Sequence, residues 1–301
     1  MHPFKIVPVT PENRGAFVEW CLEHGAEHDD SYTQPHDLAP FPTPGEIAAL
    51  ALLDGEVVGA AALMIDGFAD AGLGRFRILH ATRAEAYGPL VEHVVARTPA
   101  AVRHVYCFLP EGAAAAEALA PLGFAPTRYA IVLERAPGPV DAPRTPAGVD
   151  IRAANPGDAS AWATVINAAF ADSPGHYPMT EQRAREHLGD ERAVASFLAW
   201  RGGEPIGLVA VWRDEEAGED AAEIATLGVV PSAQGRGIGR ALLRQALMAA
   251  ANAGLPRCSL STGTVNRPAL GLYTSEGFAV VDTRVCWGRD LDERPAPQHP
   301  R

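Results

Sequence analysis

The stretch Val-Val-Pro-Ser-Ala-Gln-Gly-Arg-Gly-Ile-Gly-Arg at residues 229–240 decides the fold of the second half of this 301-residue chain. It follows an apolar, β-branched segment at 223–230, and it opens a segment at 237–253 whose apolar residues have helical spacing. Glycines at a strand-to-helix junction let backbone N–H groups approach an anion closely, and the first helical turn adds a favourable dipole. The pattern therefore predicts a phosphate or pyrophosphate site on this turn.

Two common phosphate-binding turns do not match these residues. A Walker loop requires Gly-Lys-Ser/Thr, and this stretch contains no lysine. A dinucleotide-binding fingerprint requires Gly-x-Gly-x-x-Gly, but Arg240 stands where its third glycine should be. That fingerprint also needs an acid about 20 residues further on, and the strand predicted at 257–262 carries none there. Both interpretations fail at specific residues.

The chain contains two copies of one plan. Residues 136–148 hold four prolines and two glycines, which indicates a linker. Asp-Gly-Glu-Val-Val-Gly at 54–59 matches Gly-Gly-Glu-Pro-Ile-Gly at 202–207, displaced by 148. Leu-Gly-Phe at 122–124 matches Glu-Gly-Phe at 276–278, displaced by 154. Because the displacement grows slowly and in order, a tandem repeat with loop insertions is indicated.

The second copy predicts an α+β domain with a mixed sheet. Asn155 and Pro156 are typical of a helix start. The strands are predicted at 150–153, 194–201, 205–213, 223–230, 257–262 and 280–289, and the helices at 159–169, 237–253 and 267–276.

The motif Gln-Gly-Arg-Gly-Ile-Gly at 234–239 resembles the cofactor signature of the GNAT acyltransferase superfamily. Asn266 and the Leu-Tyr-Thr-Ser-Glu-Gly-Phe segment at 272–278 are similar to a later family motif, and 222–229 resembles the family's central strand. The resemblance covers residues 149–291. It implies two tandem GNAT (acyl-CoA N-acyltransferase) domains, each with a mixed, mostly antiparallel sheet flanked by helices.

The repeat and the resemblance together predict the domain organisation. Residues 1–135 form a degenerate GNAT-like domain, 136–148 the linker, 149–291 the catalytic GNAT domain and 292–301 a disordered tail. The first copy is called degenerate because its stretch at 79–89, at the pyrophosphate position, contains a single glycine followed by a proline. In the same alignment Leu119 replaces Tyr273, and Gly112 replaces Asn266.

The resemblance implies a cofactor site. The pantetheine arm of acetyl-CoA would pair with the backbone of 227–230, and the pyrophosphate would lie on the amides of 234–240. The implied cofactor-binding residues are Leu227, Gly228, Val229, Val230, Gln234, Gly235, Arg236, Gly237, Ile238, Gly239, Arg240, Asn266 and Tyr273. A turn-capping role for Asn266 stays open.

Acetyl transfer to an amine requires a proton donor for the leaving thiolate and a neutral amine. The resemblance implies that Tyr273 is the general acid, with a packed helix-face tyrosine as the alternative. Glu223 matches a position where some family members keep a glutamate base, although a solvated strand-edge acid is equally compatible. A backbone N–H near Val229 would polarise the acetyl carbonyl.

The implied activity is acetyl-CoA-dependent N-acetylation of a small-molecule primary amine, by direct transfer in a ternary complex. A non-catalytic acyl-CoA-binding or regulatory module is the alternative. The two-copy layout is similar to that of mycothiol synthases, which acetylate a cysteinyl amine. That substrate stays open, because residues 170–192 do not identify a cysteinyl sugar.

The composition of the chain restricts the classes of binding partner and the cellular location that we expect. The net charge of −12, with no basic run, argues against nucleic acid and anionic membranes and mildly favours a cationic amine. The absence of a long apolar run or a signal-like start predicts a cytoplasmic protein, as a monomer or homodimer. No metal is predicted, because His-Gly-Ala-Glu-His at 24–28 is a weak zinc pattern with a glycine inside its helix.

Overall fold

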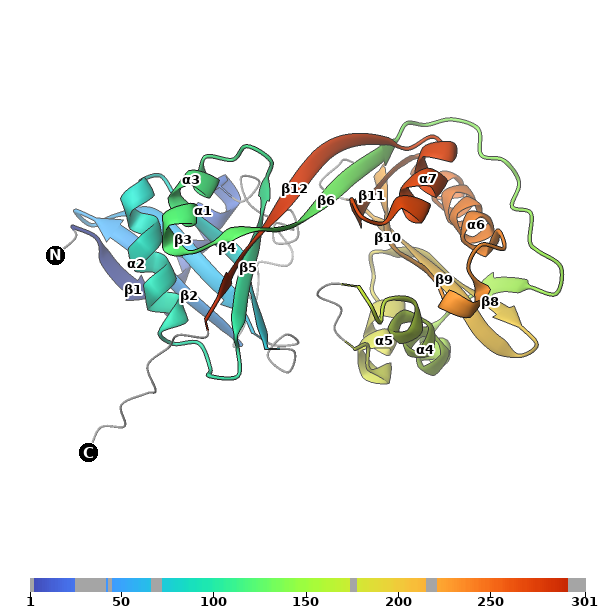
Figure 1. Ribbon diagram of the computed structural model, residues 1–301, viewed down its shortest axis with the longest axis horizontal. Coiled ribbons are helices and arrows are strands. Elements are labelled where there is room, and N and C mark those ends of the chain that lie inside the picture. Colours follow the sequence, from blue (N-terminus) through green and yellow to red (C-terminus); the bar gives the residue numbers. More distant parts are fainter. Residues whose placement is uncertain are drawn as a thin grey trace. The chain divides into compact units, whose positions relative to one another are not determined.

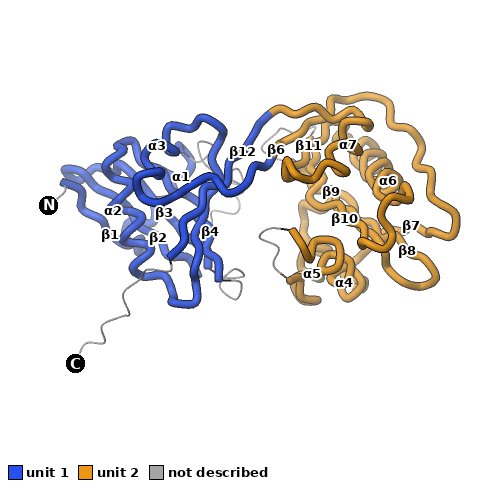
Figure 2. Tube along the Cα trace, in the orientation of Figure 1, with its two compact units in different colours: residues 1–130, 282–301 blue, residues 131–281 orange. Residues whose placement is uncertain are grey.

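The computed structural model describes residues 3–24, 42, 45–65, 72–173, 178–214 and 221–291. The chain divides into two compact units (Figure 2). Unit 1 comprises residues 1–130 and 282–301, and unit 2 comprises residues 131–281. The predicted tail at 292–301 lies outside the described residues.

Unit 2 contains the elements predicted for the second copy, except for most of the last strand predicted at 280–289 (Figure 1). They are β7 (Asp150–Ala153), α4 (Ala159–Ala169), α5 (Glu181–Leu188), β8 (Ala193–Arg201), β9 (Glu204–Arg213), β10 (Ala221–Val229), α6 (Ile238–Asn252), β11 (Arg257–Gly263) and α7 (Arg267–Ser275). Strands β7, β8, β9 and β10 pair antiparallel, whereas β10 and β11 pair in parallel. The predicted α+β class with a mixed sheet is confirmed.

Local sequence explains where α4 begins. The Asn155 side chain accepts the N–H of Gly157 at 2.9 Å, and the Asp158 carboxylate accepts the N–H of Asn155 at 3.1 Å. This reciprocal cap satisfies donors that a helix start leaves without partners. Pro156 lies in the 3₁₀ turn between the cap and α4, as its fixed φ favours.

The sheet of unit 2 separates two apolar clusters. Helix α6 covers one face with Ile238, Leu242 and Leu243, which pack on Val209 and Val211. On the other face, the fully buried Trp162 of α4 packs in a cluster with Leu208 and Ala210. Neighbouring residues of β9 therefore point to opposite faces, as strand geometry requires.

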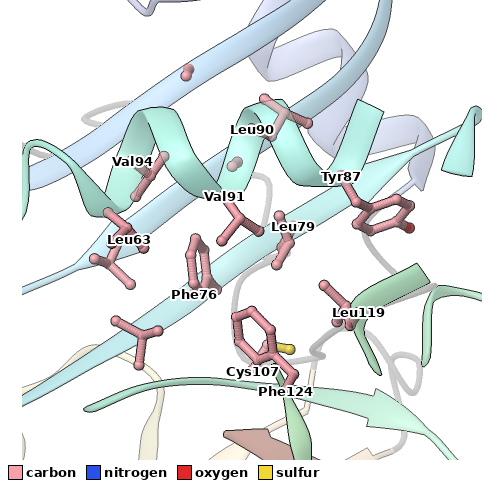
Figure 3. Close-up of a cluster of buried hydrophobic side chains, with 14 of the residues drawn as sticks. Leu63, Phe76, Leu79, Tyr87, Leu90, Val91, Val94, Cys107, Leu119 and Phe124 are labelled. Carbon is pink, nitrogen blue, oxygen red and sulfur yellow. The ribbon is translucent and has the colours of Figure 1, made fainter. Parts of the chain in front are cut away.

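Unit 1 has the same plan of strands and helices, built from different residues. Its elements are β1 (Lys5–Pro8), α1 (Arg14–His24), β2 (Glu46–Leu53), β3 (Glu56–Met64), β4 (Leu73–Ala81), α2 (Ala84–Val95), β5 (His104–Pro110), α3 (Ala115–Leu119), the first part of β6 (Ala125–Arg135) and most of β12 (Ala279–Asp290). Tyr87 and Leu90 of α2, Phe76 and Phe124 belong to one buried cluster (Figure 3). As in unit 2, one neighbouring pair, β4 and β5, is parallel.

Each unit completes its sheet with a strand that the sequence repeat assigns to the other copy. In unit 1, β12 pairs antiparallel with β5 over seven residue pairs, from Arg284↔Pro110 to Asp290↔His104. In unit 2 the strand beside β11 is β6, which is the last strand of the first copy. The compact units consequently divide the chain at 130 and 281, while the domain boundaries drawn from the repeat stay a prediction.

A truncation should reveal the role of β12. A chain that stops after Val281 loses the partner of β5 and the buried side chains of Val285, Cys286 and Leu291. Each buried apolar side chain contributes roughly 1.5–3 kcal/mol, which together approaches a typical domain stability of about 5–15 kcal/mol. We expect unit 1 to lose cooperative unfolding and the β5 amides to lose hydrogen-exchange protection.

The control is a chain that stops after Leu291, which keeps all of these contacts. It should unfold like the full chain in circular dichroism melts. Equal protection of β5 in both truncated chains would contradict the role assigned to β12.

Candidate cofactor and catalytic site

The predicted glycine turn connects β10 to α6 in an open conformation. After Val229 the chain makes a 3₁₀ turn at Pro231–Ala233 and then enters left-handed conformations at Gly235 (φ 71°) and Gly237 (φ 82°). A side chain is strained at such φ values. Residues 234–237 are exposed. The two glycines are therefore required by the backbone, and they leave the surface of the turn uncovered.

The turn presents a row of backbone donors. No side chain caps α6, and the first hydrogen bond into the helix runs from the N–H of Ala241 to the carbonyl of Gly237 at 3.1 Å. Among the described residues, the N–H groups of 235–240 have no protein acceptor. Donors in this arrangement, together with the helix dipole, fit an anion such as a pyrophosphate.

Three predicted members of the turn have structural contacts of their own. Gln234 donates through Nε2 to the carbonyl of Val229 at 3.0 Å, which closes the turn. Ile238 is buried in the cluster under α6, so only its backbone faces the turn. Arg240 donates to the carboxylate of Glu276 at 2.9 Å, and its side chain stays about half exposed. The side chain of Arg236 is exposed.

Strand β10 has an open edge beside the turn. Its parallel pairing with β11 covers only Ala221–Glu223, although both strands continue. The Val230 N–H bonds to Ile206 of β9, so the groups of Leu227 and Val229 point away from β9 by strand alternation. Apart from the Val229 carbonyl, bonded to Gln234, these groups have no described partner. An extended amide-bearing arm can pair there.

Tyr273 lies in the core next to this edge. It is 6% exposed and belongs to the cluster that includes Leu227 and Val229 of β10. Its ring meets Phe278 edge-on at 5.9 Å. Burial raises the pKa of Tyr273 to about 12, so the phenol stays protonated at neutral pH.

Asn266 and Glu223 are the other two predicted site residues, and their surroundings differ from those of Tyr273. Asn266 caps α7, since its Oδ1 accepts the N–H of Ala269 at 3.4 Å. Glu223 is half-buried and is the last β10 residue paired with β11, opposite Ser259. On the β9 side it is opposite Trp212, and the register shifts immediately after it. Glu223 therefore lies where the strands begin to separate.

The sequence analysis missed a charged cluster that fixes α6 to α7. The nearly buried carboxylate of Glu276 accepts from Arg240 and, at 2.8 and 3.0 Å, from Arg244. Arg244 also contacts Asp141 of the linker at 2.9 Å. Arg135 donates to the backbone carbonyl of Glu276 at 2.9 Å. Leu122, the aligned residue of the first copy, cannot form such a cluster. The replacement of this leucine by a glutamate in the second copy was the sequence signal that could have indicated the cluster.

In the first copy the strand end is the same but the turn is missing. The N–H of Thr82 bonds to Val58 at 3.0 Å, just as Val230 bonds to Ile206. Helix α2 begins two residues after Thr82, whereas α6 begins eight residues after Val230. The first copy therefore has no room for a glycine turn at this position.

The catalytic positions of the first copy are also changed. The bond from the Phe124 N–H to Leu119 repeats the bond from Phe278 to Tyr273, which confirms that Leu119 stands in place of the tyrosine. Arg75 pairs with Met64 in the register that Glu223 and Trp212 share in unit 2. An arginine thus stands where the candidate base would be.

The described residues contain neither a metal-binding cluster nor a membrane-spanning helix. No cluster of three or more His, Cys, Asp or Glu side chains able to hold a metal occurs in those parts of the chain. His24 stacks on His80 at 4.7 Å, and the rest of the 24–28 pattern lies outside the described residues. None of the described helices combines the length and apolar composition needed to cross a membrane.

Comparisons with known proteins bear on this geometry. A family model described as the acetyltransferase (GNAT) family matches residues 162–278. A mycothiol acetyltransferase of Thermomonospora curvata is 35% identical over 243 residues, covering 78% of this chain and 76% of the relative. The chain belongs to the GNAT acetyltransferase family. With a mycothiol acetyltransferase of Streptomyces bingchenggensis the identity is 35% over 148 residues, so the chain spans about half the length of that relative.

Solved structures share the GNAT fold over the whole chain. A GCN5-related N-acetyltransferase from Sphaerobacter thermophilus has a TM-score of 0.70 at 20% identity, covering 99% of this chain and 98% of the other. A tandem GNAT protein from the clavulanic acid biosynthesis pathway has a TM-score of 0.71 at 16% identity, covering 98% and 100%. The predicted tandem arrangement is thereby confirmed at the level of fold.

Glu276→Gln should show how much the charged cluster contributes. The variant leaves Arg240 and Arg244 facing a neutral amide, so the junction of α6 with α7 should weaken. We expect the melting temperature to fall by roughly 5–10 °C, within the usual range for single changes in a domain of this size.

The matched control is Glu181→Gln, which removes an exposed helical pair with Arg185. Its melting curve should stay within about 1–2 °C of the parent. Similar curves for the two variants would show that the Glu276 cluster adds no stability.

Proposed function

We propose that unit 2 is an acetyl-CoA-dependent N-acetyltransferase that acts on a small-molecule primary amine. The observation that carries the proposal is a pair of backbone donor sets without described protein partners, both on the segment that joins β10 to α6. One is the open edge at Leu227 and Val229, and the other is the uncapped turn at 235–240. Amide groups along an extended arm match the edge, and a pyrophosphate at the end of that arm matches the turn. Coenzyme A has this order of groups.

Each reacting atom of the transfer has a proposed protein partner. The amine nitrogen attacks the thioester carbon, and the backbone N–H of Val229 stabilises the negative charge on the carbonyl oxygen. The C–S bond then breaks, and Tyr273 donates its proton to the leaving sulfur. Glu223 accepts, directly or through water, the proton that the amine loses. The products are the acetamide and the free thiol of coenzyme A.

Transfer is direct, in a complex that holds both substrates. A covalent route would require an activated nucleophile such as a thiolate. All four cysteines are buried, and burial raises the pKa of Cys258 to about 11. These thiols are enclosed in the protein, so they do not suit an acetyl-enzyme intermediate. Free thiols and acetyl-CoA chemistry both fit the cytoplasm, which stays our proposed location.

The names of the relatives favour one of the amine classes left open by the sequence. Proteins called mycothiol acetyltransferases match about half of the chain and, for the protein of Thermomonospora curvata, 78% of it. We therefore propose a cysteinyl amine of the mycothiol synthase type as the first substrate class to test. A cationic amine is the second, because the net charge of the chain is −12.

A thiol-release assay tests the proposed function. The chain is mixed with acetyl-CoA and with cysteinyl sugars, amino acids, polyamines, aminoglycosides or peptides, and free coenzyme A thiol is followed. We expect release with at least one amine and intersecting initial-rate lines, as direct transfer requires. Parallel lines would point to an acetyl-enzyme instead. Binding of acetyl-CoA without release by any amine would favour the non-catalytic module.

Tyr273→Phe tests the assignment of the acid. Removing the proton donor should lower kcat by about 10²- to 10⁴-fold with little change in acetyl-CoA binding. Because the pKa of Tyr273 is raised to about 12, its ionisation should not reduce the parent's kcat between pH 7 and 10. Unchanged kcat in the Phe variant would remove Tyr273 from the mechanism.

Glu223→Gln is the matched variant for the base. It should lower kcat/KM for the amine and remove a rise of activity with pH on the acid side, where a carboxylate base gains its charge. An identical pH profile in parent and variant would leave amine deprotonation to water.

A further inference from the structure

The segment 136–148, which the sequence predicts as a linker, lies against α6 (Figure 1). Arg135 donates to the carbonyl of Pro139 at 2.7 Å, and Val140 packs on the cluster under α6. The next residue, Asp141, contacts Arg244, which is two helical turns from Gly237. The segment thus runs along α6 toward its N-terminus.

The segment ends beside the glycine turn. A Cβ placed on Gly237 would lie 3.9 Å from Cγ of Pro146, so Pro146 and the turn are neighbours. The N–H of Val149 bonds to the carbonyl of Pro146 at 3.1 Å, with Gly148 in the left-handed region between them. This β-turn fixes the backbone just after Arg144. Two residues of chain span at most about 7 Å, so Arg144 lies within reach of the turn for a long side chain.

The charges along this side of α6 leave two arginines without carboxylate partners. Glu276 and Asp141 are both engaged by arginines, namely Arg240 and Arg244. In the described part of the chain, no carboxylate pairs with Arg236 or with Arg144, and both side chains are exposed. Arg236 belongs to the turn itself. Arg144 is therefore an additional positive charge beside a turn whose amides already suit a pyrophosphate.

We propose that Arg144 binds the 3′-phosphate of coenzyme A. The inference rests on the proposed function, because it takes the pyrophosphate to lie on the amides of 235–240. Coenzyme A carries a second phosphate, a dianion on its ribose, within a few bonds of that pyrophosphate. A guanidinium on a fixed backbone suits such a group, because its planar donors form two parallel hydrogen bonds to phosphate oxygens. The linker then contacts the 3′-phosphate of the cofactor, which the glycine turn does not contact.

Calorimetric binding of coenzyme A and of 3′-dephospho-coenzyme A tests the proposal without any acetyl transfer. The parent should bind coenzyme A about 3- to 10-fold more tightly, the range expected for an exposed ion pair with a dianion. Arg144→Gln should bring this ratio close to one, while its affinity for the dephospho form stays at the parent value. The parent's ratio should also shrink as salt is raised from about 0.05 to 0.5 M.

Two other arginine variants serve as comparisons. Arg213→Gln changes an exposed arginine at the far end of β9, and it should keep the parent ratio. Arg267→Gln changes the first residue of α7, and should keep it too. A parent-like ratio in Arg144→Gln, or loss of the ratio in Arg267→Gln instead, overturns the proposal. Equal weakening of both ligands in Arg144→Gln places Arg144 at the pyrophosphate and also overturns it.

One outcome concerns the proposed function rather than Arg144 alone. If the parent binds neither ligand, the cofactor assignment fails and the assignment of Arg144 fails with it. If both ligands bind the parent equally tightly, the cofactor assignment stands and only the 3′-phosphate contact is wrong.

Discussion

The hydrogen bond from the Val230 N–H to the Ile206 carbonyl, at 3.0 Å, ends the ladder between β9 and β10. The site depends on the seven residues, 231–237, that separate this bond from α6. They allow two left-handed glycines and a helix start that no side chain caps. In the first copy the equivalent bond at Thr82 is followed by a helix within two residues. A glycine turn that fits an anion therefore occurs in only one of the two copies as described, and the difference is a matter of loop length.

A second constraint is that the open edge must end where the turn begins. The parallel pairing of β10 with β11 stops at Glu223, and the bulge toward β9 follows directly. Leu227 and Val229 then keep backbone groups that point to no neighbouring strand. Unpaired strand edges are normally blunted or covered in proteins. An edge that stays open next to an uncapped helix is consistent with a ligand that satisfies both.

The elements of the fold could be predicted, but the partners of its last strands could not. The apolar pattern and the turn residues place β7, α4 and α6 within one or two residues of the predicted bounds. The alternation in β6 and β12 is the same whichever sheet accepts them, so periodicity carries no information about the pairing with β5 or β11. That pairing follows from how the repeats are connected, which a local pattern does not record.

The same distinction holds for the candidate site. Glycines with positive φ and a strand-to-helix junction leave a local signature, and so 235–237 was predicted from the sequence. The Glu276 cluster joins residues 32 and 36 positions apart through side chains, and no short motif announces it. Asn266 matches the family motif, but in the described structure its side chain caps α7. A helix cap of this kind occurs in proteins of every function, so the motif match alone does not identify a cofactor contact.

The raised pKa of Tyr273 bears on whether it suits its proposed role. A donor works best when its pKa resembles that of the group it protonates. In water a thiol has a pKa of about 8.5, well below the value of about 12 for Tyr273. Cys258, which lies in the same cluster at the base of the open edge, shows what this environment does to a thiol.

Burial raises the pKa of the Cys258 thiol to about 11, because the buried thiolate loses its hydration. A cofactor sulfur seated against that cluster experiences the same loss. Its affinity for a proton then rises together with that of the phenol, and the two stay close enough for proton transfer in the transition state. Burial of Tyr273 is therefore compatible with an acid, provided that the sulfur is buried along with it.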